Sequence, residues 1–292
     1  MHTIFSFEVF PPKKTMGIDT IYKTLDDLKD IKPDFISVTY GAGGSADSGA
    51  TLEIAERIRS VCGVEAVAYM PCLYMSRAKA ENMLHKLRAA GIGSILALRG
   101  DIQSGSQPQH KQAVKPEGDF QHADDLVSFI REFDDRQHDG KQFTLFGACY
   151  PEKHPESPDV ISDIHALKAK VDAGVSRLIS QLFFNNDAFY RFLERAHLAS
   201  IEVPVEAGIM PVINKKQIEH MTAICGASLP EKFIKILDKY GDSPEALRDA
   251  GIAYAVDQIA DLVTQGVDGI HLYTMNNAYV AQRINDAVRS LF

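Results

Sequence analysis

Short apolar runs alternate with longer stretches of helical periodicity along nearly the whole chain. Apolar runs of a few residues, bounded by glycine, proline or polar residues, are typical of buried strands, whereas apolar positions three and four apart are typical of amphipathic helices. The pattern predicts eight strands, at Thr3–Val9, Asp34–Tyr40, Val64–Met70, Ile95–Leu98, Phe143–Tyr150, Ser176–Phe183, Val203–Ile209 and Gly269–Tyr273. A helical pattern follows each of them.

Regular alternation of strand and helix predicts parallel strands with right-handed crossovers. Eight such units in 292 residues favour a single α/β domain over residues 1–292, a closed (β/α)8 TIM barrel. Ser157-Pro158 is expected to start the helix after the fifth strand, with serine as the cap and proline as the first helical residue. Residues 214–265 hold more helix than one crossover needs, so we expect extra helices before the last strand, beginning at Lys215, Pro230 and Ser243-Pro244.

Composition narrows the class of protein without identifying it. Hydrophobic residues make up 45% and charged residues 24%, which is ordinary for a globular protein with a proper core. The net charge of −8 and the absence of a basic block argue against a nucleic-acid groove, and no apolar run suits a membrane span. No secretion signal precedes the first strand, and the four cysteines lack metal-binding spacing, so we expect a cytoplasmic protein with buried thiols and no metal.

The strand ends carry the candidate chemistry, because active sites of such barrels lie at the carboxyl ends of the strands. The polar residues there are Glu8, Thr39, Tyr40, Tyr69, Arg99, Gly100, Asp101, Tyr150, Gln181 and Tyr273. Opposite charges in Arg99-Gly100-Asp101, at the exit of a buried strand, are costly unless something uses them. One open alternative is that Arg99 and Asp101 only pair with each other and close a loop.

Glu8 is the most informative single residue. Alternation along the first strand places Phe5, Phe7 and Val9 outward against helices, so Glu8 should point into the barrel mouth. A desolvated carboxylate there has a raised pKa, which suits general-acid catalysis. The competing hypothesis is a structural glutamate paired with a basic neighbour.

Further candidates lie in the loops and helices that follow the strands. His154 is assigned binding at most, and Asp163 and Lys170, about two helical turns apart, either meet a ligand or form a solvated stripe. The glycine-rich segment 41–46 resembles a dinucleotide fingerprint, but it follows the second strand and no acidic residue ends the next one, so we interpret it as a flexible loop over a ligand. The long polar segment 102–121 is predicted to be a functional lid or disordered.

Five motifs in order resemble one family: Ser6-Phe7-Glu8-Val9-Phe10-Pro11-Pro12, Ser37-Val38-Thr39-Tyr40-Gly41-Ala42, Leu98-Arg99-Gly100-Asp101, Tyr150-Pro151-Glu152-Lys153-His154-Pro155-Glu156 and His271-Leu272-Tyr273-Thr274-Met275-Asn276. Across nearly its whole length the chain resembles bacterial 5,10-methylenetetrahydrofolate reductases, flavoproteins built on a (β/α)8 barrel. The resemblance implies hydride transfer from NADH or NADPH to FAD, and from reduced FAD to the one-carbon bridge of methylenetetrahydrofolate, by ping-pong kinetics. It also implies a homo-oligomer.

The resemblance also implies roles for individual residues. Glu8 would protonate the folate so that its five-membered ring opens to an iminium, and Asp101 would orient the folate and tune the flavin potential. The implied flavin-binding residues are Thr39, Tyr40, Ala42, Tyr69, Arg99, Gly100, Asp101, His122, Ala123, Tyr150, His154, Asp163 and Lys170. The implied substrate-binding residues are Gln181, Gln217 and Tyr273. The chain departs from enterobacterial relatives at five positions, Tyr69, Ala166, Ala169, Met221 and Asn277. These differences affect how the adenosine end of the flavin and the folate tail would be held.

Three other functions stay open at this point. A proline-dehydrogenase-like flavin barrel should need paired arginines near the last strand, and residues 271–277 contain none. A flavin-free, folate-binding methyltransferase barrel and a non-enzymatic barrel within a larger complex both leave an inward Glu8 together with Asp101 unexplained. The sequence contains no motif that reads the nicotinamide ribose, so it does not choose between NADH and NADPH.

Overall fold

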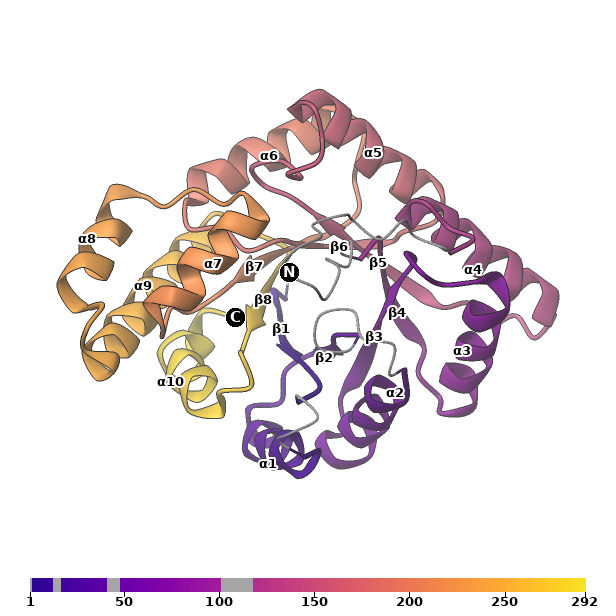
Figure 1. Cartoon of the computed structure of the whole chain (residues 1–292), viewed down its shortest axis with the longest axis horizontal. Helices are drawn as coiled ribbons and strands as arrows, with labels where there is room; N and C mark the ends of the chain where they lie inside the picture. Colours follow the sequence, from indigo (N-terminus) through magenta and orange to yellow (C-terminus); the bar gives the residue numbers. More distant parts are fainter. Residues whose placement is uncertain (1, 13–16, 41–47, 101–117) are drawn as a thin grey trace, which may run out of the picture.

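The computed structural model is a closed barrel of eight parallel strands surrounded by helices (Figure 1). It describes residues 2–12, 17–40, 48–100 and 118–292. The strands follow one another around the barrel in sequence order, and the last pairs with the first. The predicted (β/α)8 architecture is therefore confirmed.

All eight predicted strands are present, with bounds that differ from the prediction by up to three residues. They are β1 Ile4–Val9, β2 Phe35–Val38, β3 Glu65–Pro71, β4 Ser94–Leu98, β5 Thr144–Cys149, β6 Arg177–Ser180, β7 Val205–Ile209 and β8 Gly269–Tyr273. The sixth is shortened most, because the apolar residues after Ser180 pack in the core outside the regular ladder. Apolar runs therefore overstate strand length where they continue into a buried loop.

Helices follow each strand, and three of them separate β7 from β8 as predicted. The helices are α1 Asp19–Leu28, α2 Ser48–Arg57, α3 Arg77–Ala89, α4 Ala123–Gln137, α5 Val160–Asp172, α6 Asn186–Leu198, α7 Lys215–Cys225, α8 Glu231–Tyr240, α9 Pro244–Thr264 and α10 Ala278–Val288. Ser243 caps α9 and Pro244 is its first residue, as the sequence indicates.

The predicted start of α5 is wrong. The helix begins at Val160, and its cap is Asp159, whose carboxylate accepts a hydrogen bond of 2.7 Å from the Ser162 amide. The Ser157 hydroxyl instead donates to Asp163 Oδ1 at 2.8 Å. Ser157 and Asp159 both offer a side-chain oxygen that could cap α5. The backbone of Asp159 is extended, as a cap requires, so Asp159 is the cap.

Two apolar layers hold the barrel together. Outward residues of β1, namely Phe5, Phe7 and Val9, pack in the large core between the strands and the helices. Each such side chain contributes roughly 1.5–3 kcal/mol when fully buried. A smaller cluster that includes Phe35 and Phe146 fills the barrel interior. This apolar interior leaves the polar strand ends facing the carboxyl end of the barrel.

The extra helices widen one side of the molecule. In Figure 1, α7 and α8 stand outside the ring on the side of β7 and β8. They enclose a separate apolar cluster, in which Phe184 and Phe233 stack with ring centres 4.7 Å apart and which also contains Tyr273. In the part of the chain that the structure describes, no helix combines the length and apolarity that crossing a membrane requires.

Candidate active site

A cavity of 690 Å³ opens at the carboxyl ends of the strands, within the size range of small-molecule sites. The predicted site residues that line it are Glu8, Tyr69, Arg99, Gly100, His122, Ala123, Tyr150, His154, Asp163, Lys170, Gln181 and Tyr273. They come from segments far apart in the sequence, from β1 to β8, so the closed sheet brings them to one place. The cavity lies at the end of the barrel where the site is predicted.

Other predicted residues do not contribute to this cavity in the described parts of the chain. Thr39, Tyr40 and Gln217 are not among the residues that line it. The Thr39 carbonyl accepts a hydrogen bond from the Thr51 hydroxyl at 3.0 Å, and the Gln217 amide donates to the cap of α7. Ala42 and Asp101 lie outside the described residues, as do the glycine-rich segment 41–46 and residues 102–117 of the long polar segment.

Glu8 points into the cavity from the upper part of β1, as alternation along the strand predicts. The Tyr69 hydroxyl donates a hydrogen bond of 2.6 Å to Glu8 Oε2. Burial raises the pKa of Glu8 to about 7, against the opposing effect of this hydrogen bond. Among the described residues Glu8 forms no ion pair, which argues against the structural alternative of a glutamate held by a basic neighbour. Its pKa suits an acid that works near neutral pH.

Two buried tyrosines flank Glu8. Burial is the main cause that raises the pKa of both Tyr69 and Tyr273, and the nearby Glu8 adds to it, so both phenols keep their protons. The Tyr273 hydroxyl donates to the Ser180 carbonyl at 2.7 Å. This hydrogen bond fixes the Tyr273 side chain across the barrel, whereas the Tyr69 hydroxyl donates to Glu8.

The exit of β4 is built around Gly100. Its φ of +84° is a left-handed conformation, and a Cβ added there would lie 3.0 Å from the Pro71 side chain. The preceding Arg99 donates from Nη2 to Glu156 Oε1 at 2.6 Å, and this hydrogen bond is the main cause that lowers the pKa of Glu156. The structure therefore pairs Arg99 with the loop after β5.

A polar end of the cavity is formed by that loop and α5. Asp163 accepts hydrogen bonds from the His154 amide at 3.2 Å and from the Ser157 hydroxyl at 2.8 Å, so it holds the loop in place. Lys170 is half-buried, desolvation lowers its pKa, and its Nζ donates to the Ala148 carbonyl at 2.5 Å. Within the described residues Lys170 has no ion-pair partner. An ammonium beside a cavity suits an anionic ligand such as a phosphate.

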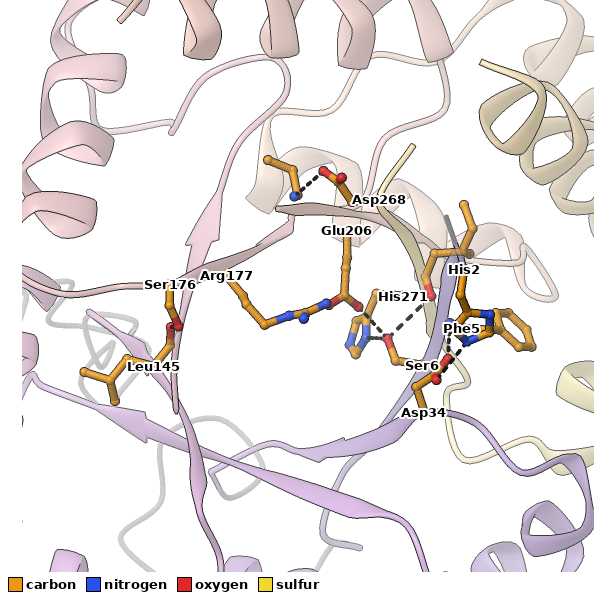
Figure 2. Close-up of polar contacts among 12 residues, drawn as sticks. His2, Phe5, Ser6, Asp34, Leu145, Ser176, Arg177, Glu206, Asp268 and His271 are labelled. Atoms are coloured by element: carbon orange, nitrogen blue, oxygen red, sulfur yellow. Dashed lines mark hydrogen bonds and ion pairs between the residues drawn. The ribbon is translucent and has the colours of Figure 1, made fainter. Parts of the chain in front are cut away.

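The sequence reasoning missed a set of polar residues inside the barrel, below the cavity. Ser6, Ser37, Glu206 and His271 are all fully buried, and Arg177 reaches Glu206 from β6 (Figure 2). Burial raises the pKa of Glu206 to about 7 and lowers that of His271 to about 3. The sequence feature that could have identified these residues is a polar side chain at an inward position of an otherwise apolar strand.

No cluster of three or more metal-ligating side chains occurs in the described ranges. The acid–base groups that the described lining offers include Glu8 and its two neighbouring tyrosines. The cavity lining thus includes both an acid, Glu8, and a cation, Lys170.

Comparison with known proteins assigns the family. The family model described as methylenetetrahydrofolate reductase matches residues 1–289. The 5,10-methylenetetrahydrofolate reductase of Escherichia coli (strain K12) is 34% identical over 279 residues, covering 96% of this chain and 88% of that protein. The methylenetetrahydrofolate reductase (NADH) 1 of Arabidopsis thaliana is 36% identical over 283 residues. That match covers 94% of this chain and 46% of the plant protein, so the chain spans about half the length of its plant relatives.

The solved structures that are similar share the fold. One is an uncharacterized protein from Clostridium thermocellum that binds two copies of 5-methyl-5,6,7,8-tetrahydrofolic acid. It has a TM-score of 0.61 and 13% sequence identity, and the match covers 99% of this chain and 95% of that one. At this identity the likeness extends to the barrel architecture alone.

Proposed function

Because this chain belongs to the methylenetetrahydrofolate reductase family, we propose that it reduces 5,10-methylenetetrahydrofolate to 5-methyltetrahydrofolate. In this proposal NADH or NADPH would supply the hydride by way of a bound FAD, and the two substrates would take turns in one cavity. The observation that carries the proposal is Glu8, a carboxyl group in the barrel mouth whose pKa burial raises to about 7. A reductase of this kind needs such an acid, because the cyclic substrate accepts a hydride only after its ring opens.

The cavity fits a flavin in size and in chemistry. Its 690 Å³ lies within the range of sites for organic cofactors. Arg99, Gly100, Tyr150 and His154 would hold the ring system, and the ammonium of Lys170 matches a ribityl or phosphate group. When bound, FAD supplies a carrier that accepts two electrons from one substrate and passes them to the next.

Two alanines of α5 would face the flavin on the side where its adenosine end is expected. Ala166 and Ala169 line the cavity on the same helix as Lys170. Their methyl groups offer packing and no hydrogen bonds, so the phosphate side must supply most of the polar contacts. This distribution makes Lys170 the main electrostatic anchor among the described residues.

Glu8 donates the proton that opens the folate ring. Its carboxylic acid gives a proton to a ring nitrogen, the bond between that nitrogen and the bridging carbon breaks, and the resulting iminium carbon accepts the hydride. The carboxylate left on Glu8 is stabilised by the hydrogen bond from Tyr69. With a pKa of about 7, Glu8 is protonated in a large fraction of molecules at neutral pH.

The substrate side of the cavity is lined by Gln181, Tyr273 and Met221. Gln181 Oε1 accepts a hydrogen bond from the Leu182 amide at 2.8 Å, which orients the side chain. Asn277 is occupied as the cap of α10, where its Oδ1 accepts from the Val280 amide at 3.2 Å. We therefore assign pterin recognition to Gln181 and Tyr273, and no role in substrate binding to Asn277.

The experiment follows the colour of the purified protein. It should be yellow, should bleach with NADH or NADPH, and should recolour when methylenetetrahydrofolate is added. Glu8→Gln should leave bleaching nearly intact and slow recolouring by about 10²-fold or more, as expected when a general acid is lost. Glu202→Gln, a change at an exposed glutamate, is the matched control.

Two results would count against this proposal. A protein that purifies colourless and does not take up FAD would exclude the flavin chemistry. Equal losses of bleaching and recolouring in Glu8→Gln would exclude a specific role for Glu8 in the folate step. The homo-oligomeric state and the cytoplasmic location implied at the outset stay predictions.

A further inference from the structure

A line of buried polar side chains crosses the barrel interior from the amino ends of the strands to Glu8. It begins at Arg177, the first residue of β6, and reaches Glu8 near the carboxyl end of β1. Between these ends its members are Glu206, Ser6, His271, Ser37 and Tyr69. Apolar side chains fill most of the remaining interior, so this line is a feature that the fold must have a reason to retain.

The lower half of the line is shown in Figure 2. Arg177 Nη2 donates to Glu206 Oε1 at 3.1 Å. The other carboxyl oxygen of Glu206 lies 2.8 Å from the Ser6 hydroxyl, which in turn lies 2.7 Å from His271 Nδ1. Glu206, Ser6 and His271 are each 0% exposed, so no solvent competes for these bonds.

The upper half continues from the other ring nitrogen of His271. His271 Nε2 lies 3.2 Å from the Ser37 hydroxyl, and Ser37 is one of the neighbours that lower the pKa of the Tyr69 phenol, which places the two hydroxyls next to each other. The Tyr69 hydroxyl then donates to Glu8 Oε2 at 2.6 Å. Hydrogen bonds thus connect Glu206 to Ser37 and Tyr69 to Glu8, and the neighbouring hydroxyls of Ser37 and Tyr69 lie between these two parts.

Every group between the two carboxyls can both donate and accept a proton. Serine and tyrosine hydroxyls do so by rotation, and a neutral imidazole has one N–H and one bare nitrogen. His271 is neutral because burial holds its pKa near 3. When Glu206 is protonated, all the bonds can therefore point toward Glu8; when Glu206 is ionised, all can point the other way.

We propose that Glu206 is a proton reservoir for Glu8, connected to it through Ser6, His271, Ser37 and Tyr69. The inference rests on the proposed function, in which Glu8 gives up a proton to the folate. It adds a second carboxyl group to the acid chemistry of the site, at the opposite end of the barrel interior.

The step balances as a relay of protons with no change in oxidation state. After Glu8 has lost its proton, it takes one from the Tyr69 hydroxyl, which takes one from Ser37, which takes one from His271 Nε2. His271 Nδ1 takes the Ser6 proton, and Ser6 takes the proton of Glu206. The net result is a neutral Glu8 and an ionised Glu206. Solvent that enters the emptied cavity supplies the proton that returns the relay to its starting state.

The charges around the two carboxyls favour this relocation. Among the described residues, Glu206 faces Arg177 and Ser6 and feels the more distant Asp34, whereas Glu8 faces only Tyr69 and Tyr273. The negative charge left by catalysis thus moves from a carboxyl without a cation to one that has a guanidinium at 3.1 Å. Burial raises the pKa of both carboxyls to about 7, so either of them can hold the proton near neutral pH.

Infrared titration of the ligand-free protein tests the relay without any flavin. The carbonyl band of protonated carboxylic acids is followed against pH, with Glu8→Gln and Glu206→Gln to assign the two groups. Because all the hydrogen bonds of the relay point the same way, it favours the state in which the two carboxyls hold one proton between them. The wild type should therefore titrate in two steps separated by about one pH unit or more. Ser37→Ala cuts the relay, and there the two steps should merge.

Activity gives a second reading in the loaded enzyme. In the pH–rate profile of the folate half-reaction, Glu206→Gln and Ser37→Ala should each move the alkaline limb to lower pH by about one unit. On that limb the rate at a given pH should fall roughly tenfold. The nicotinamide half-reaction should not change. Ser94→Ala, which removes another buried serine hydroxyl from the barrel without touching the relay, is the matched control and should leave both readings as in the wild type.

The outcomes separate the hypotheses. Coinciding infrared titrations of the wild type and Ser37→Ala would overturn the relay and leave the line of residues as a structural network. If Ser37→Ala does not fold, as judged by thermal unfolding, Ser6→Ala cuts the same line one step lower and decides the question. A colourless wild-type protein without folate reduction would refute the proposed function. The infrared titration would still test the proton connection between Glu8 and Glu206, because it needs neither flavin nor folate.

Discussion

Replacing Glu8 with glutamine should make the ligand-free protein more stable above neutral pH. A carboxyl group whose pKa is raised in the folded state binds protons more tightly there than in the unfolded chain. Burial raises the pKa of Glu8 from 4.5 to about 7. Between these values the unfolded chain ionises first, so the free energy of unfolding falls as the pH rises, and above pH 7 the loss is complete.

The shift sets the size of the effect. A difference of 2.5 between 4.5 and about 7 corresponds to about 3 kcal/mol at 1.36 kcal/mol per unit. Glu8 borders a cavity that admits water, so this value is an upper bound. Glutamine preserves the shape and can still accept the Tyr69 hydrogen bond, but it has no charge to desolvate. At about 2 °C per kcal/mol, the variant should melt above the wild type at pH 8, by at most about 6 °C.

Urea or thermal unfolding of both proteins between pH 4 and pH 9 measures this difference. The two curves should run close together below pH 4.5 and separate progressively up to pH 7. Glu202→Gln, at an exposed position, should follow the wild type throughout. Parallel curves for Glu8→Gln and the wild type would refute the reasoning, because they would mean that Glu8 titrates alike in the folded and unfolded states.

Three further predictions concern the flavin anchor, a turn and a buried ion pair. Lys170→Met should weaken FAD binding by about tenfold or more in a fluorescence titration, through loss of a charge-assisted contact, whereas Lys168→Met on the outer face of α5 should not. Gly100→Ala should lower the free energy of unfolding by roughly 1–3 kcal/mol, more than Gly17→Ala, because both positions have positive φ but only Gly100 also has a close neighbour. Asp134→Ala should lower the free energy of unfolding in urea by roughly 1–3 kcal/mol, since it removes the carboxylate that Arg88 contacts at 2.7 Å and leaves the buried Phe143 amide without its acceptor.

The architecture of this protein could be predicted from local patterns. Strand and helix periodicities depend on residues a few positions apart, and eight alternations leave few ways to bury every apolar face. The same alternation placed Glu8 inward, and the structure agrees. Helix starts were less certain, because Asp159 and Ser157 both offer an acceptor and only the backbone conformation decides between them.

The sequence by itself determined which strands form, in what order they close, and at which end the cavity opens. The partners of Glu8 were decided by the tertiary structure alone. Tyr69 is 61 positions from Glu8, and Ser6 is 200 positions from Glu206 and 265 from His271. Such pairs meet only when the barrel closes with one particular stagger between its strands, which sets the inward residues that share a level. That stagger is a property of the whole sheet, and no local pattern contains it.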